Sequence, residues 1–364
     1  MGINVRAGCL NSGKTRFLLS VRVLLSVYTY IELARLFEAR GDPAMAAAAA
    51  PTRPEAAAPQ LLDTQHEDHV HDVAWDYYAR RLATCSSDGT VKIFAADGEA
   101  TAHEATITGH GGPVWQVCWA HPRYGQVVAS CGYDGQVLVH KEDAPGRWTA
   151  VHAWSGGEGA SVNAVCWAPE GAGVLQLACA ASDGRATILA HDATSGEWAA
   201  SSFLASPLGL TSCSWCPVEA TGSATAEGAL VPRLATGGCD ALVKVWRRED
   251  PNADAWDLEP VANGGKAHTG WVRDVAFSPF YGEPKPCLIS CSDDKSVLVW
   301  TRNDLNGPWA SRVVTTCDAP VWRVAWSVAG CVLAVSSGDD AVSLWKESVT
   351  GDWHELAEPE QAAT

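Results

Sequence analysis

One pattern near the start of the chain has the spacing of a nucleotide-binding loop. Residues Gly8-Cys9-Leu10-Asn11-Ser12-Gly13-Lys14-Thr15 match G-x4-G-K-[ST], in which backbone amides cradle phosphates, the lysine reaches the terminal phosphates and the hydroxyl residue holds magnesium. Such a loop must follow a buried strand in a parallel sheet. Seven residues precede Gly8, and no alternation of strands and helices follows. We therefore interpret the match as coincidental and expect no nucleotide cofactor.

Three later groups of residues could also carry chemistry. His268, Ser290 and Asp294 are the residue types of a hydrolytic triad. Cys213 and Cys216 form a C-x-x-C pair, but a zinc ribbon needs a second pair and a redox motif needs a βαβ context. A third group consists of His66, His69 and His71. Because repeat positions explain most of these residues, as shown below, we expect no catalytic, cofactor-binding or metal-binding residues and a non-enzymatic protein.

Six copies of a two-part pattern organise the rest of the chain. In each copy a short strand ends in an aromatic residue. A turn Asp follows later in the copy, and another strand ends six residues after this Asp. The aromatic residues are Trp75, Trp119, Trp167, Trp215, Phe277 and Trp326, and the turn residues are Asp88, Asp134, Asp183, Asp240, Asp294 and Asp339. The aromatic residues lie 44 to 62 residues apart, which is the period of a WD40 blade lengthened by loops. We predict an all-β WD40 propeller of six blades.

In the WD40 pattern a His, a Ser or Thr, the turn Asp and the closing Trp form a buried chain of hydrogen bonds. Only the fifth repeat has all four residues, and they are His268, Ser290, Asp294 and Trp300. The first two repeats keep the His and the Asp but end in Phe94 and His140. Because a polar network stabilises a core only when it is satisfied, packing must contribute more in the other blades.

Composition restricts the partners and the domain division. The net charge of −16 argues against direct binding to nucleic acid or to anionic membranes, and 13 Cys at mostly strand positions are typical of a reducing compartment. We expect an extension outside the propeller over residues 1–60, a propeller over residues 61–357 and a disordered tail over residues 358–364. The composition changes at Met45, so we expect Met45 to be the initiator and residues 1–44 to be dispensable.

Several runs between the repeat positions resemble one family closely. Among them are Asp76-Tyr77-Tyr78, His121-Pro122-Arg123-Tyr124-Gly125, Trp271-Val272-Arg273-Asp274-Val275-Ala276 and Gly307-Pro308-Trp309. Together they resemble the small WD40 subunit of the COPII outer coat, which is also a subunit of the nuclear-pore Y-complex. The resemblance covers roughly residues 61–356 and is more specific than a general WD40 match.

The resemblance implies an open six-bladed propeller that receives a seventh blade from a partner. The implied partners are the large COPII outer-coat subunit and a Y-complex nucleoporin, both helical solenoids. The implied roles are ER-to-Golgi transport and pore scaffolding. The implied locations are the cytoplasmic face of the endoplasmic reticulum membrane, COPII vesicles and the nuclear pore complex, with membrane association indirect through the coat.

Two other functions fit a propeller of this kind. One is the related six-bladed nucleoporin restricted to the pore, although the Asp-Tyr-Tyr and His-Pro-Arg-Tyr-Gly runs favour the coat subunit. The other is a general WD40 adaptor such as the substrate receptor of a ubiquitin ligase, which would have a closed propeller with a basic or aromatic pocket on its top face. Co-purification of a helical partner would distinguish these functions.

The last repeat predicts how the ring ends. It already has its own outer strand, from Trp353 to Leu356, so the strand-like run from Leu61 to Gln65 is left as one strand of an incomplete seventh blade. We expect a partner to supply the other three strands between the sixth and first blades by β-augmentation. The candidate residues for this interface are Leu61, Leu62, Val73, Trp75, Trp322 and Trp326.

Overall fold

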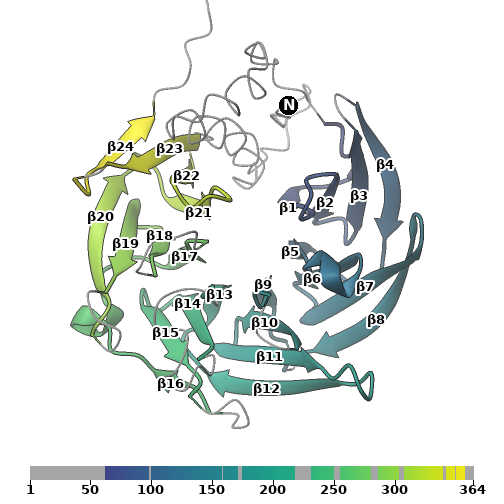
Figure 1. Ribbon diagram of the computed structural model, residues 1–364, viewed down its shortest axis with the longest axis horizontal. Coiled ribbons are helices and arrows are strands. Elements are labelled where there is room, and N and C mark those ends of the chain that lie inside the picture. The colour runs from purple at the N-terminus through teal and green to yellow at the C-terminus, as the bar shows by residue number, and fades with distance from the viewer. Residues whose placement is uncertain are drawn as a thin grey trace, which may run out of the picture.

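The computed structural model describes residues 62–97, 100–157, 159–170, 174–217, 231–249, 255–279, 286–302, 307–338, 342–348 and 350–356. The whole N-terminal extension with its P-loop match, Leu61, Asp339 and the tail over residues 358–364 lie outside these ranges. In the described part, six antiparallel sheets of four strands follow one another around a ring (Figure 1). The predicted six-bladed β-propeller is confirmed.

Each blade takes four consecutive strands, and the first of them lies innermost. Blade 1 consists of β1 Val70–Trp75, β2 Arg81–Ser86, β3 Val91–Asp97 and β4 Ala100–Ile107. Blade 2 consists of β5 Val114–Trp119, β6 Val127–Gly132, β7 Gln136–Ala144 and β8 Arg147–Ser155. Blade 3 consists of β9 Val162–Trp167, β10 Leu175–Ala181, β11 Arg185–His191 and β12 Trp198–Leu204.

The remaining strands complete the ring. Blade 4 consists of β13 Leu210–Trp215, β14 Arg233–Gly238, β15 Val243–Arg247 and β16 Asp257–Leu258. Blade 5 consists of β17 Val272–Phe277, β18 Leu288–Ser292, β19 Ser296–Thr301 and β20 Ala310–Thr316. Blade 6 consists of β21 Val321–Trp326, β22 Val332–Ser337, β23 Val342–Glu347 and β24 Trp353–Leu356. Two short 3-10 helices lie in the described connections, η1 at Pro122–Tyr124 and η2 at Ala262–Gly265.

The turn Asp of each repeat has a local structural role. In blades 1 to 5 its Oδ1 accepts a hydrogen bond from the backbone N–H two residues later, as Asp294 does from Ser296 at 3.0 Å. This Asx turn stabilises the hairpin between the second and third strands of each of these blades. The residue directly after the turn Asp has a positive φ. It is Gly in blades 1 to 3, Ala241 in blade 4 and Lys295 in blade 5.

Along the last four of its six residues, each innermost strand alternates between its two neighbouring blades, whereas a bulge interrupts the alternation nearer its start. We number the six residues as positions 1 to 6, so that Val70 and Trp75 are positions 1 and 6 of β1. Side chains at positions 4 and 6 pack toward the preceding blade, and the side chain at position 5 packs toward the following blade. This follows from the period of two in a strand, and it gives every blade two apolar faces.

Five apolar clusters join consecutive blades. Each contains buried residues of two sheets, as where Val297 and Val299 of blade 5 meet Val321 and Val324 of blade 6. Side chains at position 3 add hydrogen bonds between neighbours. Asp72 accepts from the N–H of Val117, and Asp274 accepts from the N–H of Val324. The core is therefore a series of inter-blade layers instead of one central cluster.

Blade 5 contains the complete chain of hydrogen bonds. The Trp300 indole donates to Ser290 Oγ at 2.8 Å, Ser290 lies 2.7 Å from His268 Nε2, and His268 Nδ1 lies 3.1 Å from Asp294 Oδ2. Trp300 is 1% exposed. In blade 4, Trp246 donates to Thr236 Oγ1, and Lys244 bonds Asp240, so a Lys contacts the turn Asp where the His is lacking.

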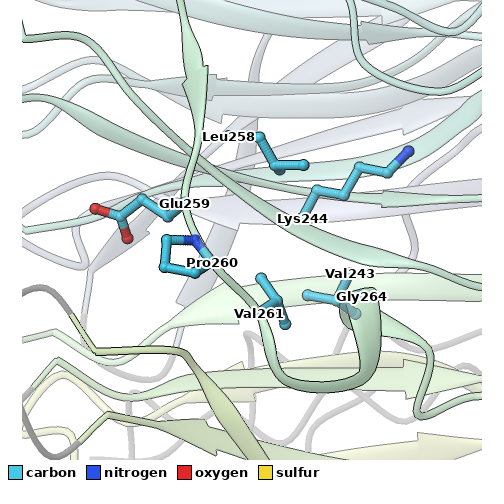
Figure 2. Close-up of a pocket in the computed structure, with 7 residues that line it drawn as sticks. All are labelled: Val243, Lys244, Leu258, Glu259, Pro260, Val261 and Gly264. Carbon is cyan, nitrogen blue, oxygen red and sulfur yellow. The ribbon is translucent and has the colours of Figure 1, made fainter.

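Blade 4 has the shortest outer strand of the six. After the two residues of β16 the chain turns away at Glu259, whose buried carboxylate accepts from Arg233 at 2.7 Å and from Trp309 of the next blade at 2.8 Å. A niche of about 250 Å³ lies between β15 and this departing segment. In Figure 2 the Glu259 carboxylate points away from the other lining residues, so the niche itself is mainly apolar.

We predict that Trp300→Ala lowers the free energy of unfolding by about 3–5 kcal/mol, because it leaves a large cavity in a closely packed core. Trp300→Phe imitates blade 1, which has Phe94 at the same repeat position, and should cost about 1 kcal/mol for the lost hydrogen bond. Chemical denaturation of both variants measures these values. An unchanged transition midpoint for Trp300→Ala would contradict the assigned role of this residue.

Candidate interface at the open edge of the propeller

Two apolar clusters are each built from one blade alone. Val73, Leu82 and Phe94 form a cluster on blade 1, with Leu62 and Trp75 packed against it. Ala325, Val332 and Ala334 form a cluster on blade 6, with Cys331, Leu344 and Leu356 packed against it. These are the face of blade 1 toward a preceding blade and the face of blade 6 toward a following one. We call the two faces together the open edge.

Figure 1 shows the open edge as a break in the ring. Blades 1 and 6 lie on either side of an interval in which no described strand is placed, whereas the other five neighbouring pairs of blades are in contact. The open edge is therefore the one place among the described sheets where a blade face lacks a second sheet.

The indole of Trp75 marks the same break. At position 6, four tryptophans donate Nε1–H to the position-5 carbonyl of the preceding blade, and they are Trp119 to Ala74 (2.9 Å), Trp167 to Cys118 (3.2 Å), Trp215 to Cys166 (3.1 Å) and Trp326 to Ala276 (3.1 Å). Trp75 is the equivalent in blade 1, and its Nε1 is buried and has no hydrogen-bond partner among the described residues. The outer-strand residues Trp148 and Trp353 also have unpaired indoles, but at those positions the repeat provides no inter-blade acceptor.

The channel side of the open edge carries a half-buried arginine. Arg323 occupies position 3 of β21, where blades 1 and 5 have an acidic residue. Burial disfavours the charged guanidinium, yet the carboxylates of Asp274 and Asp72 hold the pKa of Arg323 above its usual value. Asp72 belongs to blade 1 and Asp274 to blade 5, so Arg323 interacts electrostatically across the break. Because a guanidinium only donates, Arg323 cannot accept an N–H as Asp72 and Asp274 do.

The structure separates the residues that the sequence placed at this interface. Val73 and Trp75 lie on the open edge, and Leu62 packs against them. Trp322 and Trp326 instead contact blade 5. The Trp322 ring lies 4.4 Å from the Arg273 guanidinium, and Trp326 packs in the cluster that joins blades 5 and 6. Trp326 is at position 6, which packs toward the preceding blade, and Trp322 at position 2 meets the position-2 residue Arg273 of that blade.

The blade 6 residues that do lie on the open edge could have been found from the strand period. Position 5 of β21 is Ala325, and the residues that share its face are Val332, Ala334 and Leu344. The prediction chose the large tryptophans instead of the alternating position. The run from Leu62 to Gln65 also differs from expectation, because these residues form no strand, and no described neighbouring strand is available to pair with them. Leu61 lies outside the described residues.

Comparison with known proteins gives the family. The WD domain, G-beta repeat family matches residues 59–94, 102–141, 261–301 and 311–346. The SEC13 homologue of Drosophila melanogaster is 44% identical over 300 residues, which cover 81% of this chain and 82% of the relative. This chain belongs to the SEC13 family. The protein transport protein sec13 of Emericella nidulans is 42% identical over 318 residues, covering 84% of this chain and 100% of the relative.

The other groups that could carry chemistry have structural contacts in this SEC13-family chain. His268 and Asp294 belong to the hydrogen-bond chain of blade 5, and Cys213 packs in the layer between blades 3 and 4. His71 bonds Ser87 Oγ at 2.6 Å and contacts the Trp115 ring. No group of three metal-ligating side chains occurs among the residues with described positions, and no helix in that part of the chain is long and apolar enough to cross a membrane.

Burial changes the titration of the repeat histidines. It lowers the pKa of His66, His110 and His268, although the neighbouring Asp side chains oppose the effect. It lowers the pKa of His140 to about 4, and His110 adds to this shift. Burial would raise the pKa of Asp294, but hydrogen bonds from Ser296 and Thr269 outweigh it and lower this pKa to about 2.

These shifts predict loss of stability in acid. A His whose pKa is lowered in the folded state takes up a proton more readily when the chain is unfolded. Its contribution to stability is therefore present above about pH 6.5 and is lost as the pH falls from about 6.5 toward the folded-state pKa. The Asp294 contribution is present above its unfolded pKa and is lost only as the pH falls toward 2.

We predict that His140→Phe reduces this acid sensitivity, because it removes a buried group that must stay neutral. Blade 1 already has Phe94 at the same position. At each pH the unfolding free energy of the variant is compared with that of the wild type. This difference should favour the variant by about 1–2 kcal/mol more at pH 5 than at pH 7.5. Thermal or urea unfolding at the two pH values tests this. An equal change in unfolding free energy at both pH values would show that His140 takes up no proton on unfolding.

Proposed function

We propose that the chain is a non-enzymatic scaffold subunit of the COPII vesicle coat that binds its partner by accepting a β-blade in trans at the open edge. Its relatives in Emericella nidulans and Mycosarcoma maydis are named protein transport proteins. The family resemblance extends the proposal to a second assembly, the Y-complex of the nuclear pore. In both, the partner would be a helical solenoid that supplies the inserted blade. The chain would then act at the cytoplasmic face of the endoplasmic reticulum membrane and at the nuclear pore.

The unpaired indole of Trp75 carries this proposal. In four blades the equivalent Trp donates to the carbonyl of the innermost strand of the preceding blade. An unmade buried hydrogen bond costs about 1–3 kcal/mol, and an inserted innermost strand would provide the acceptor. No other kind of partner accounts for the repeat position of this donor as directly.

The two single-blade clusters support the same arrangement. A blade placed between blades 6 and 1 would complete two apolar layers, one against Ala325, Val332 and Ala334 and one against Val73, Leu82 and Phe94. Each of the other five layers is completed by a neighbouring blade of this chain. Interfaces that resemble a divided core are characteristic of lasting complexes, which suits a coat or pore scaffold.

The charge of the chain agrees with indirect attachment to membranes. At a net charge of −16, an anionic membrane or nucleic acid would be repelled by most of the surface. We therefore propose that contact with the membrane is made through the coat, and that the propeller binds protein alone.

Trp75→Phe tests the proposal with a matched control in blade 2. Removal of the Trp75 indole N–H should weaken binding of the partner's blade-donating segment about three- to tenfold, because one inter-blade hydrogen bond is lost. It should remove no hydrogen bond that stabilises the isolated chain, so the unfolding free energy should not fall as it does for a paired indole. Trp119→Phe removes the equivalent bond within the chain, so it should cost about 0.5–1.5 kcal/mol of stability and leave binding unchanged.

The measurement uses the full chain and calorimetric titration with the blade-donating segment of the large COPII outer-coat subunit. A parallel titration uses the corresponding segment of the Y-complex nucleoporin. Binding by both supports a shared open edge, and binding by only one would restrict the function to that assembly. Equal stability losses in the two variants, with no change in affinity, would contradict insertion at Trp75.

A further inference from the structure

Two thiols meet across the interface between blades 3 and 4. Cys166 is at position 5 of β9 and points toward blade 4, and Cys213 is at position 4 of β13 and points toward blade 3. Their Sγ atoms are 3.6 Å apart. Cys213 is 6% exposed and Cys166 is half-buried. The C-x-x-C spacing drew attention to Cys213 and Cys216, but the thiol nearest to Cys213 belongs to the neighbouring blade.

We propose that Cys166 and Cys213 are an oxidative modification site at which a hydroperoxide forms a disulfide between the two blades. The more exposed thiol, Cys166, attacks the peroxide as its thiolate. The O–O bond breaks, an S–O bond forms, and one water or alcohol leaves with the released oxygen. Cys213 then attacks the sulfenic sulfur, the S–S bond forms, and the S–O bond breaks with loss of water. Two thiols are oxidised by two electrons, and the peroxide is reduced by two.

The repeat shows that this pair is a special feature of one interface. Position 4 is valine in the other five blades. Cys118 occupies position 5 in blade 2 as Cys166 does in blade 3, but the position-4 residue of the next blade in its cluster is Val165 and not a cysteine. Cys118 therefore has no position-4 cysteine across its interface with which to form the equivalent disulfide, although its strand and repeat position match those of Cys166.

The location gives the disulfide a mechanical consequence. In Figure 1 the β9 and β13 strands lie on the side of the ring opposite the open edge. A covalent link there would fix blades 1–3 relative to blades 4–6 and would limit how far the two sides of the open edge can separate. If the proposed blade insertion is correct, oxidised protein should bind the partner segment more slowly than reduced protein.

Peptide mapping of the full chain under non-reducing conditions tests the site directly. After treatment with one equivalent of hydrogen peroxide, we expect a crosslinked peptide containing Cys166 and Cys213, its loss on reduction, and a rise in the melting temperature of about 5 °C. Cys213→Val and Cys166→Ala adopt residues that other blades have at these positions, so both should fold and both should abolish the crosslink and the temperature rise.

Other results would overturn the inference. Accumulation of sulfinic acid at Cys166 without the crosslink would show that the thiols cannot reach disulfide geometry. Crosslinks that occur equally at Cys118 would show unselective oxidation. Because the peptide map does not involve a partner, it stands apart from the binding experiment. A crosslink that leaves the association rate unchanged would remove only the proposed effect on the open edge.

Discussion

The structure depends on the alternation of side chains in the six innermost strands. Because successive residues of a strand point to opposite faces, every blade has one apolar face toward each neighbour, and neither is buried by the blade itself. Five inter-blade layers satisfy this requirement within the chain. The two faces that remain are those of Val73 and Ala325 at the ends of the ring. Closure of the ring is thus a question of how these two apolar faces are covered.

Polar groups follow the same geometry as the apolar layers. The position-6 indoles of blades 2, 3, 4 and 6 donate to a carbonyl of the preceding blade, and position-3 side chains such as Asp72 and Asp274 accept an N–H from the following one. These bonds run in one direction around the ring, so an open ring must leave an unsatisfied donor on its first blade. Trp75 is that donor. At the other end, Arg323 replaces an acceptor with a donor whose charge is balanced by Asp274 and Asp72.

The sequence predicted the blades well because their signals are local. The turn Asp and the aromatic at the end of the innermost strand each have a role within a few residues or in the neighbouring blade, so their period could be read directly. The complete hydrogen-bond chain of His268, Ser290, Asp294 and Trp300 could be named for the same reason. The open edge was harder to assign. Trp322 and Trp326 were named for this edge although both contact blade 5, whereas Ala325 was missed because small residues carry little signal.

Degenerate repeats allow individual interfaces to differ while the ring is kept. In blade 4 the turn Asp bonds Lys244 instead of a His, and the outer strand has two residues. After this strand the buried Glu259 accepts a hydrogen bond from blade 5. In the interface between blades 3 and 4, Cys213 stands where the other blades have valine, and it lies opposite Cys166. Neither change disturbs the alternation on which the layers depend, because a thiol and a valine both fit an apolar layer. Chemistry that is specific to one interface can therefore arise at positions 4 and 5 without cost to the fold, and these are the positions at which neighbouring blades meet.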